Sequence, residues 1–151
     1  MRSGESDFLD GLEGTEIVTP AQPDFELPER TWVITTKLEE VSLSMHQEDL
    51  EDSIGPGFTA TTSLCHLKSD DHQPPAFLRL YCQTPVIGTE WSLPQQRANQ
   101  AAAFFEPAEL SAFKTFMKHS CPVVPQLLGY DHTLQADTGI IPRGYKKASI
   151  L

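Results

Sequence analysis

The chain has 151 residues, a formal net charge of −10 and an apolar fraction of 39%, which suffices for one modest domain. The acidic balance argues against nucleic acid as a partner, because phosphate backbones need clustered Lys and Arg and only Lys146 and Lys147 adjoin here. No run approaches the roughly 20 apolar residues of a membrane span, and the N-terminus lacks the layout of a signal peptide. These features predict a cytoplasmic protein without a membrane partner.

Charge divides the chain into two unequal parts. Residues 1 to 53 carry fourteen Asp and Glu against three Lys and Arg, whereas residues 54 to 151 carry seven against eight. Residues 1–30 mix Gly, Ser, Pro and acids around isolated apolar side chains such as Phe8, a composition typical of disordered segments. The sequence therefore predicts an acidic flexible tail over residues 1–30, with at most a short docking contact.

The first predicted strand follows this tail. The run TWVITTK from residue 31 is β-branched and aromatic, which favours a strand. Val41, Leu43 and Met45 alternate with polar residues, so the strand is expected to resume briefly before a Gly-Pro-Gly break. The acidic segment from Glu39 to Asp52 is otherwise interpreted as a solvated loop. Trp32 is expected to be a packing anchor, as is Trp91 further along the chain.

Two more strands are predicted in FTATTSLCHL and AFLRLYCQ, separated by the turn SDDHQPP. Short connections between three consecutive strands predict an antiparallel meander. Alternation places Phe77, Arg79 and Tyr81 on one face of the third strand and Leu78 and Leu80 on the other.

The clearest helix begins at Pro107, which suits a first helical turn, and Glu109 lies near the positive end of its dipole. Its expected core stripe is Leu110, Phe113, Phe116 and Met117. Pro122 cannot continue the helix, so an end near His119 is predicted. A shorter helix is predicted in QQRANQAAAF, a fourth strand in VVPQLLGYDH and the start of a fifth in GIIPRGY. The predicted fold class is α+β, with an antiparallel β-sheet and one packed helix.

The three cysteines are odd in number and have no paired spacing, which predicts free, buried thiols. An alternative zinc ligand set would be Cys65, His66, His119 and Cys121. Neighbouring residues on a strand point to opposite faces, however, so this alternative is disfavoured. The sequence predicts neither a metal site nor a catalytic residue.

Arg79 is the residue that raises a functional question. It lies in the centre of the apolar run PPAFLRLYCQTP, where a permanent charge must either reach water or hold an anion. Glu109 follows on the helix, and a guanidinium can bind a carboxylate through two parallel hydrogen bonds. Alternative interpretations are an edge-strand charge facing water for Arg79, and compensation of the helix dipole for Glu109.

Four stretches of the sequence give the chain a family resemblance. They are AFLRLYCQTPVIGTEW, QQRANQAAAFFEPAELSAFKTF, CPVVPQLLGYDHTLQ and IPRGY. It resembles fungal kinase-like proteins related to the aminoglycoside phosphotransferase and choline kinase families, over residues 31–145. The resemblance implies the small lobe of a kinase-like fold. Arg79 would take the place of the phosphate-contacting cation and Glu109 that of the helix carboxylate, with Glu106 in reserve. Full-length relatives would use ATP and magnesium to phosphorylate a small hydroxyl compound.

The chain departs from this pattern in several ways. IGPGF stands where relatives carry a Gly-x-Gly-x-x-Gly loop, and Phe77 occupies a position where protein kinases usually keep alanine. No His-x-Asp catalytic segment and no Asp-Phe-Gly motif is present. The expectation is therefore an inactive fragment, arising from a truncated gene model, a splice variant or a relic, in which residues 146–151 are a tail or truncation scar.

The competing hypothesis is a noncatalytic protein-interaction module with an acidic N-terminal tail. Its protein partner would bind the face that a large lobe normally covers, because an uncovered apolar surface tends to bind something. Continuation of the reading frame into a large lobe would favour the phosphotransferase hypothesis, and a true stop would favour the module.

Overall fold

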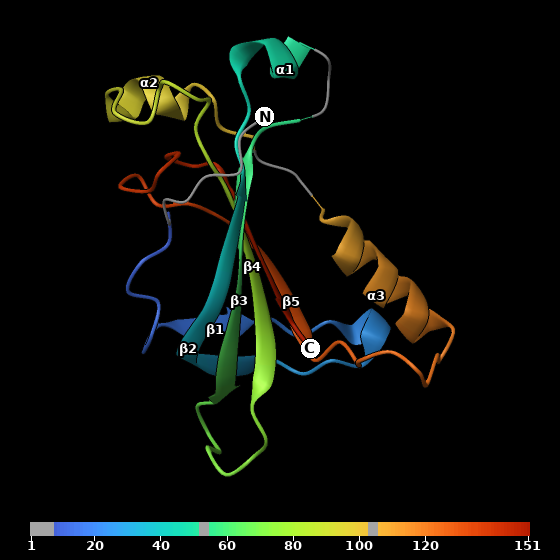
Figure 1. Cartoon of the computed structure of the whole chain (residues 1–151). Helices are drawn as coiled ribbons and strands as arrows, with labels where there is room; N and C mark the ends of the chain where they lie inside the picture. The colour runs from blue at the N-terminus through green and yellow to red at the C-terminus, as the bar shows by residue number, and fades with distance from the viewer. Residues whose placement is uncertain (1–7, 52–54, 103–105) are drawn as a thin grey trace.

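The computed structural model describes residues 8–51, 55–102 and 106–151, whose strands form one antiparallel sheet in the order β1-β2-β3-β4-β6-β5 (Figure 1). The strands are β1 (Glu16–Thr19), β2 (Arg30–Leu43), β3 (Phe58–Leu67), β4 (Ala76–Gln83), β5 (Gly129–Leu134) and β6 (Tyr145–Ile150). The helices are η1 (Pro23–Phe25), a single 3₁₀ turn, and α1 (Gln47–Glu51), α2 (Pro94–Ala98) and α3 (Ala108–Lys118). The predicted α+β class with an antiparallel sheet is confirmed.

Strands β2, β3 and β4 form the predicted meander, paired antiparallel along their lengths. The helix predicted from Pro107 is also confirmed, since α3 runs from Ala108 to Lys118 with Pro107 as its N-cap. Of its predicted stripe, Leu110 is buried, whereas Phe116 is 37% exposed. The predicted shorter helix corresponds to α2, although residues 103 and 104 of that prediction lie outside the described residues.

The acidic segment after Glu39 is not the solvated loop that was predicted. Strand β2 continues without a break to Leu43, and α1 follows it, while residues 52–54 lie outside the described residues. Two register shifts interrupt the pairing of β2 with β3. Together they restore the alternation begun by Trp32 and Ile34, so that Glu40 lies on the same buried face as these two residues.

The predicted flexible tail is wrong for the part that contains β1 and η1, while residues 1–7 lie outside the described residues. Strand β1 pairs with the start of β2, and Ile17 and Leu27 are 9% and 7% exposed. The apolar residues here are too sparse to give a period. They are buried because they cover apolar surface of the sheet and of α3, which composition alone does not reveal.

The prediction that residues 146–151 form a tail or truncation scar is also wrong. They belong almost entirely to β6, which lies between β4 and β5, and Ile150 is fully buried. The two adjacent lysines at 146 and 147 interrupt the alternation of polar and apolar residues by which a strand is recognised in a sequence. The predicted fourth and fifth strands were accordingly placed too early, since β5 begins at Gly129 and β6 at Tyr145.

The sheet curls until its two edge strands, β1 and β5, touch. Arg30 at the start of β2 donates from Nη1 to the carbonyl oxygen of Leu128, at 2.8 Å. A Cβ atom on Gly129 would lie 2.6 Å from Oγ1 of Thr19, so only glycine permits this approach. Trp32 donates to the same Thr19 hydroxyl and is 4% exposed, which confirms it as a packing anchor.

The curled sheet has two distinct faces. The inner face holds the main apolar cluster, which includes Leu78, Leu80 and Ile150. The opposite face, called here the α3 face, carries Arg79 and Tyr81 and is flanked by α3 (Figure 1). The predicted alternation along β4 is therefore confirmed.

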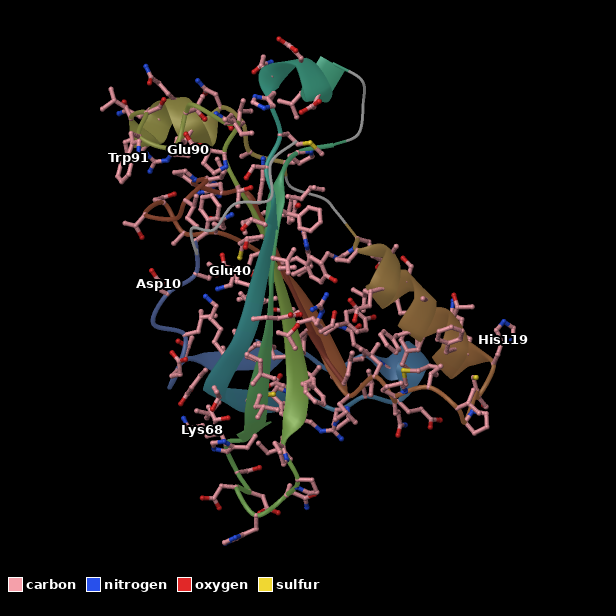
Figure 2. The ribbon with its side chains drawn as sticks, viewed as in Figure 1. Asp10, Glu40, Lys68, Glu90, Trp91 and His119 are labelled. Carbon is pink, nitrogen blue, oxygen red and sulfur yellow. The ribbon has the colours of Figure 1, made fainter. Side chains whose placement is uncertain are left out.

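Trp91 is not the packing anchor that was predicted. It is 98% exposed in the turn before α2, and its side chain points away from the sheet (Figure 2). A single exposed aromatic residue in a polar turn leaves no sequence signal that separates it from a buried one.

Candidate functional site

The α3 face presents one arginine in the middle of a β-strand. Arg79 lies directly opposite Thr62 of β3 and Ser149 of β6, so the residue is flanked by strands on both sides. Its side chain is 25% exposed. Arg79 is thus not an edge-strand charge facing water, and its guanidinium needs partners from the protein.

Glu109 is the main charged partner. Nε of Arg79 lies 3.2 Å from Oε2 of Glu109, which the first turn of α3 brings over the sheet. This confirms that the two residues are in contact. Only one direct hydrogen bond joins them, rather than the two parallel bonds that were expected.

Tyr81 completes the link between these two charges. Its hydroxyl donates to Oε2 of Glu109 at 2.7 Å and accepts a longer hydrogen bond from Nη2 of Arg79, at 3.4 Å. The guanidinium carbon of Arg79 also lies 5.6 Å from the centre of the Tyr81 ring. Sequence alternation placed Tyr81 on the correct face but assigned it no role.

The remaining contacts of Arg79 come from β2 and β3. Nη1 donates to the hydroxyl of Thr62, and Oε1 of Glu39 lies 3.9 Å away. Burial opposes the charge of Arg79, but the hydrogen bond to Tyr81 and the charge of Glu109 outweigh it and raise its pKa. The guanidinium is therefore fixed from several directions and stays charged. Burial raises the pKa of Tyr81 as well, so Tyr81 stays protonated.

Glu106, the reserve candidate, contacts other residues. Its carboxylate accepts hydrogen bonds from Lys114 at 2.5 Å and Ser111 at 2.6 Å, and the Lys114 bond does most to lower its pKa. Glu109, not Glu106, is consequently the carboxylate that holds Arg79.

Lys147 is a second cation on the α3 face, and the sequence interpretation missed it. It lies opposite Tyr81 in the register of β4 and β6 and is 4% exposed. Burial lowers its pKa, while the nearby charges of Glu106 and Asp131 act in the opposite direction. Its position in a stretch expected to be a tail concealed this burial.

Glu40 is a buried carboxylate on the inner face, also missed because it lay in the presumed acidic loop. Its side chain is 1% exposed, toward the C-terminal end of β2 (Figure 2). It accepts hydrogen bonds from Nζ of Lys37, the hydroxyl of Thr59 and the backbone amides of Phe8 and Leu9. Glu40 thereby ties the N-terminal segment to the sheet.

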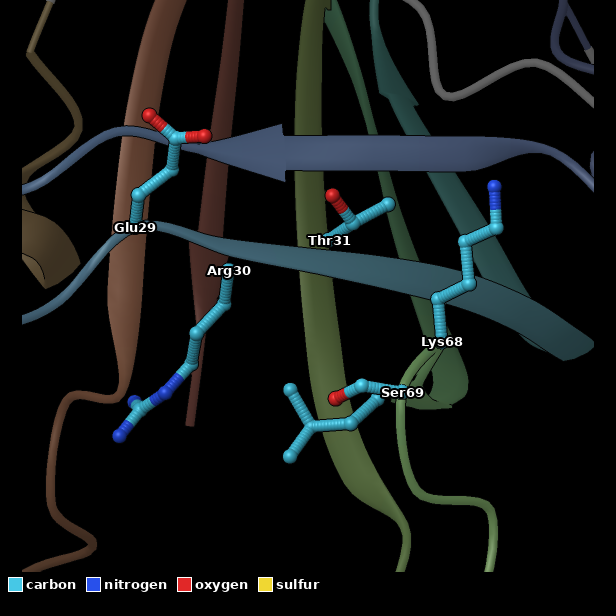
Figure 3. A pocket seen from close by; sticks show the side chains of 6 residues that line it. Glu29, Arg30, Thr31, Lys68 and Ser69 are labelled. Atoms are coloured by element: carbon cyan, nitrogen blue, oxygen red, sulfur yellow. The ribbon is translucent and has the colours of Figure 1, made fainter.

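Figure 3 shows a cavity at the opposite end of β2, lined by Glu29, Arg30, Thr31, Leu67, Lys68 and Ser69. Its charged side chains diverge rather than meet. Nζ of Lys68 lies 2.8 Å from Oε1 of Glu16, and Arg30 is bound to the carbonyl of Leu128. This cavity therefore presents no convergent set of groups to a ligand.

Neither a metal cluster nor a reactive thiol emerges from the part of the chain that the structure describes. Within it, no group of three or more His, Cys, Asp or Glu is placed to hold a metal ion. Cys65 and Cys82 are buried and free, and burial raises their thiol pKa to about 12 and about 11. Cys121 is free and half-buried.

Comparison with known proteins adds no family assignment: no family model, no curated protein and no solved structure matches this chain. Among the described residues, none of the helices has the length and apolar character needed to cross a membrane.

Proposed function

We propose that residues 30–150 form the nucleotide-binding small lobe of a kinase-like phosphotransferase, in which Arg79 contacts the phosphates of ATP. The observation that carries this proposal is the contact between Nε of Arg79 and Oε2 of Glu109. The order of elements supports it: strands β2, β3 and β4 are followed by α3 and then by β5 and β6, with α1 inserted between β2 and β3 and α2 before α3. A cation on β4, the third of these strands, is held by an acid of α3. This is the arrangement that the family resemblance implies.

The geometry suits the binding of an anion. The guanidinium has five N–H donors, and Glu109, Thr62 and Tyr81 use one each. Two donors remain, on Nη1 and Nη2, and Oε1 of Glu39 lies 3.9 Å from Nη1, so a phosphate would bind the guanidinium in competition with this carboxylate. Glu109 and Tyr81 hold the guanidinium of Arg79 in place before the ligand binds, which lowers the entropic cost of binding.

Phosphoryl transfer needs more groups than Arg79 and Glu109. A bound magnesium ion would neutralise charge on the phosphates, and a further residue would orient the acceptor hydroxyl. The described residues bring together no carboxylate cluster for the metal, so no catalytic step is assigned to them. The 151-residue chain is expected to bind ATP weakly and to show neither hydrolysis nor transfer.

Titration of the ¹⁵N-labelled chain with ATP and magnesium tests the proposal by NMR. Amide shifts are expected around Arg79 and Thr62, and Arg79→Ala should weaken binding by roughly tenfold, the value of one charge-assisted contact. Lys118→Ala, which removes an exposed cation of α3, serves as the control and should leave the affinity unchanged. Equal effects of the two substitutions, or robust turnover by the wild-type chain, would contradict the proposal.

A second candidate is the protein-interaction module, favoured by apolar side chains exposed on the α3 face. Phe77 is 49% exposed and Val41 57% exposed, and the strand register puts both on the same face as Arg79. Because residues 1–53 carry most of the acidic charge, the fitting partner is a basic segment with apolar side chains. Titration with a basic amphipathic peptide tests this candidate, since Phe77→Ser should abolish peptide binding without changing the response to ATP.

A further inference from the structure

The N-terminal segment, defined here as residues 8–14, lies against the inner face of the sheet without forming one of its strands. Each of its residues is half-buried or exposed. The segment passes the part of β2 that carries Glu40 (Figure 2). Leu9 and Leu12 pack against the main apolar cluster of the inner face. The segment therefore resembles a short peptide bound to a domain, with the difference that the two are covalently joined.

The sheet contacts this peptide mainly through its backbone. The carboxylate of Glu40 accepts a hydrogen bond from the amide of Phe8, 2.6 Å from Oε2, and another from the amide of Leu9, 3.1 Å from Oε1. Nζ of Lys37 donates to the carbonyl oxygen of Leu9 at 2.9 Å. Every peptide offers such groups, apart from the missing N–H of proline. Other peptides can therefore make the same hydrogen bonds.

Contacts that do not involve the segment hold Glu40 and Lys37 in place. Nζ of Lys37 lies 2.7 Å from Oε1 of Glu40, and the hydroxyl of Thr59 donates to Oε2 at 2.7 Å. The side chains of Glu40 and Lys37 are 1% and 13% exposed. Departure of the segment would remove two hydrogen bonds from Glu40 and uncover apolar surface. Both effects favour the binding of another peptide at the same place.

The segment can leave the sheet without breaking the pairing of the strands. Residues 8–12 are held by side chains, and among the described residues the first backbone hydrogen bond from the segment to the sheet runs from Gly14 to the carbonyl oxygen of Ile34. Strand β1 pairs with β2 only from Glu16 onward. Exchange of residues 8–12 for another peptide therefore requires no rearrangement of the sheet.

We propose that the inner face carries a peptide-binding site, which the N-terminal segment occupies in cis and which binds a peptide of a partner protein in trans. The chemistry of the partner follows from that of the segment: two adjacent N–H groups for Glu40, and two apolar side chains three residues apart in place of Leu9 and Leu12. A covalently tethered competitor has an effective concentration in the millimolar range, so the segment inhibits binding of the partner. The site lies on the face opposite Arg79 and depends on neither function proposed above.

A labelled, acetylated peptide of residues 7–15, DFLDGLEGT, is the probe. The full-length double variant Leu9→Asp/Leu12→Asp should bind it saturably in fluorescence anisotropy, because these substitutions weaken the cis segment and leave the sheet unchanged. Wild type should bind it more weakly by at least roughly tenfold, since its own segment competes. Equal affinities of the two chains, or no binding to the folded double variant, would overturn the proposal.

Two modified peptides test recognition of the backbone. N-methylation of the leucine that corresponds to Leu9 keeps its side chain but removes the N–H that donates to Glu40, and should weaken binding by roughly tenfold. N-methylation at the position of Asp10, whose amide donates to no group among the described residues, is the control and should have little effect. Equal affinities of these two peptides would contradict the assigned contacts.

Substitutions in the sheet test the same contacts from the protein side. In the double variant, Glu40→Gln should weaken peptide binding by roughly tenfold. Glu39→Gln changes the neighbouring carboxylate, which lies near Arg79 on the opposite face, and should leave the affinity unchanged. Equal losses for the two substitutions would exclude Glu40 as the group that binds the peptide.

Wild type provides a test that does not depend on folding of the double variant. At millimolar concentrations of the peptide, the NMR signals of Phe8 and Leu9 should move toward their positions in the free peptide, while signals around Arg79 stay in place. Unmoved signals of Phe8 and Leu9 would overturn the proposal. Light scattering should show a wild-type monomer, since a dimer formed by exchange of the segment would assign the site to a second copy of this chain instead.

Discussion

Arg79 carries a charge within an apolar strand because three different groups share its guanidinium. A carboxylate, a phenol and a threonine hydroxyl come from α3, β4 and β3, respectively. The sequence suggested the carboxylate, since Arg79 is the one charged residue of the strand and Glu109 lies in the first turn of the helix, with Glu106 in reserve. It did not indicate Tyr81 as the bridge, because a two-residue spacing on a strand shows a shared face and not a shared hydrogen bond.

Removal of Arg79 should destabilise the protein more than removal of Lys118. Arg79→Ala leaves Glu109 and Tyr81 without their shared partner and is expected to lower the free energy of unfolding by about 1–2 kcal/mol. Lys118 lies near the ring of Phe25 at the exposed end of α3, and Lys118→Ala should cost less than about 0.5 kcal/mol. Urea denaturation measures both values. Equal losses would show that the guanidinium contacts contribute little to stability.

At the scale of elements, sequence patterns located those with a strong local signal. Strand β4 is an apolar run that follows a proline-containing turn, and α3 has a proline at its N-cap and an apolar stripe, and both were predicted close to their bounds. Strand β1 was missed and β6 was placed too early, because their burial depends on a sheet that curls over them. Four residues in β1 and two adjacent lysines in β6 are too weak a signal on their own.

The contact between Glu40 and the N-terminal segment should make stability depend on pH. Burial opposes the charge of Glu40, but hydrogen bonds from Lys37, Thr59 and two backbone amides outweigh it and lower its pKa below the ordinary value of 4.5. A lowered folded-state pKa contributes stability above the unfolded pKa, and this contribution is lost as the pH falls through the folded pKa. Acid should therefore release the N-terminal segment.

Glu40→Gln tests this dependence. At pH 7 the substitution is expected to lower the free energy of unfolding by about 1–3 kcal/mol, because it weakens four hydrogen bonds to a buried charge. The difference from wild type should shrink as the pH falls below about 4.5. The control is Glu39→Gln, whose side chain is 60% exposed. A difference that is constant between pH 7 and pH 3 would contradict this role.

At the scale of the whole molecule, the contact between the edge strands β1 and β5 closes the curled sheet. Gly129 in β5 lies against Thr19 in β1, where a Cβ atom would approach Oγ1 to 2.6 Å. Gly129→Val should therefore force the edges apart and destabilise the protein by about 1–3 kcal/mol. Gly88→Val makes the same change at a glycine with open space around it but a positive φ of 95°.

Comparing the two variants distinguishes loss of the contact between β1 and β5 from local strain in a turn, because the two effects occur in different parts of the chain. Gly129→Val should speed amide hydrogen exchange in both β1 and β5, whereas Gly88→Val should affect only the turn before α2. If Gly129→Val leaves the exchange of β1 unchanged, the two edges do not support each other.

The meeting of β1 with β5 has a consequence for synthesis on the ribosome. Strand β1 emerges first, and more than a hundred further residues must be synthesised before β5, its neighbour at the other edge of the sheet, is available. Contacts between such distant stretches of chain form slowly, because the intervening loop must close first. Until β5 pairs, the apolar side chains of the inner face of the sheet are exposed to water. A nascent chain with such exposed apolar surface is expected to bind a chaperone.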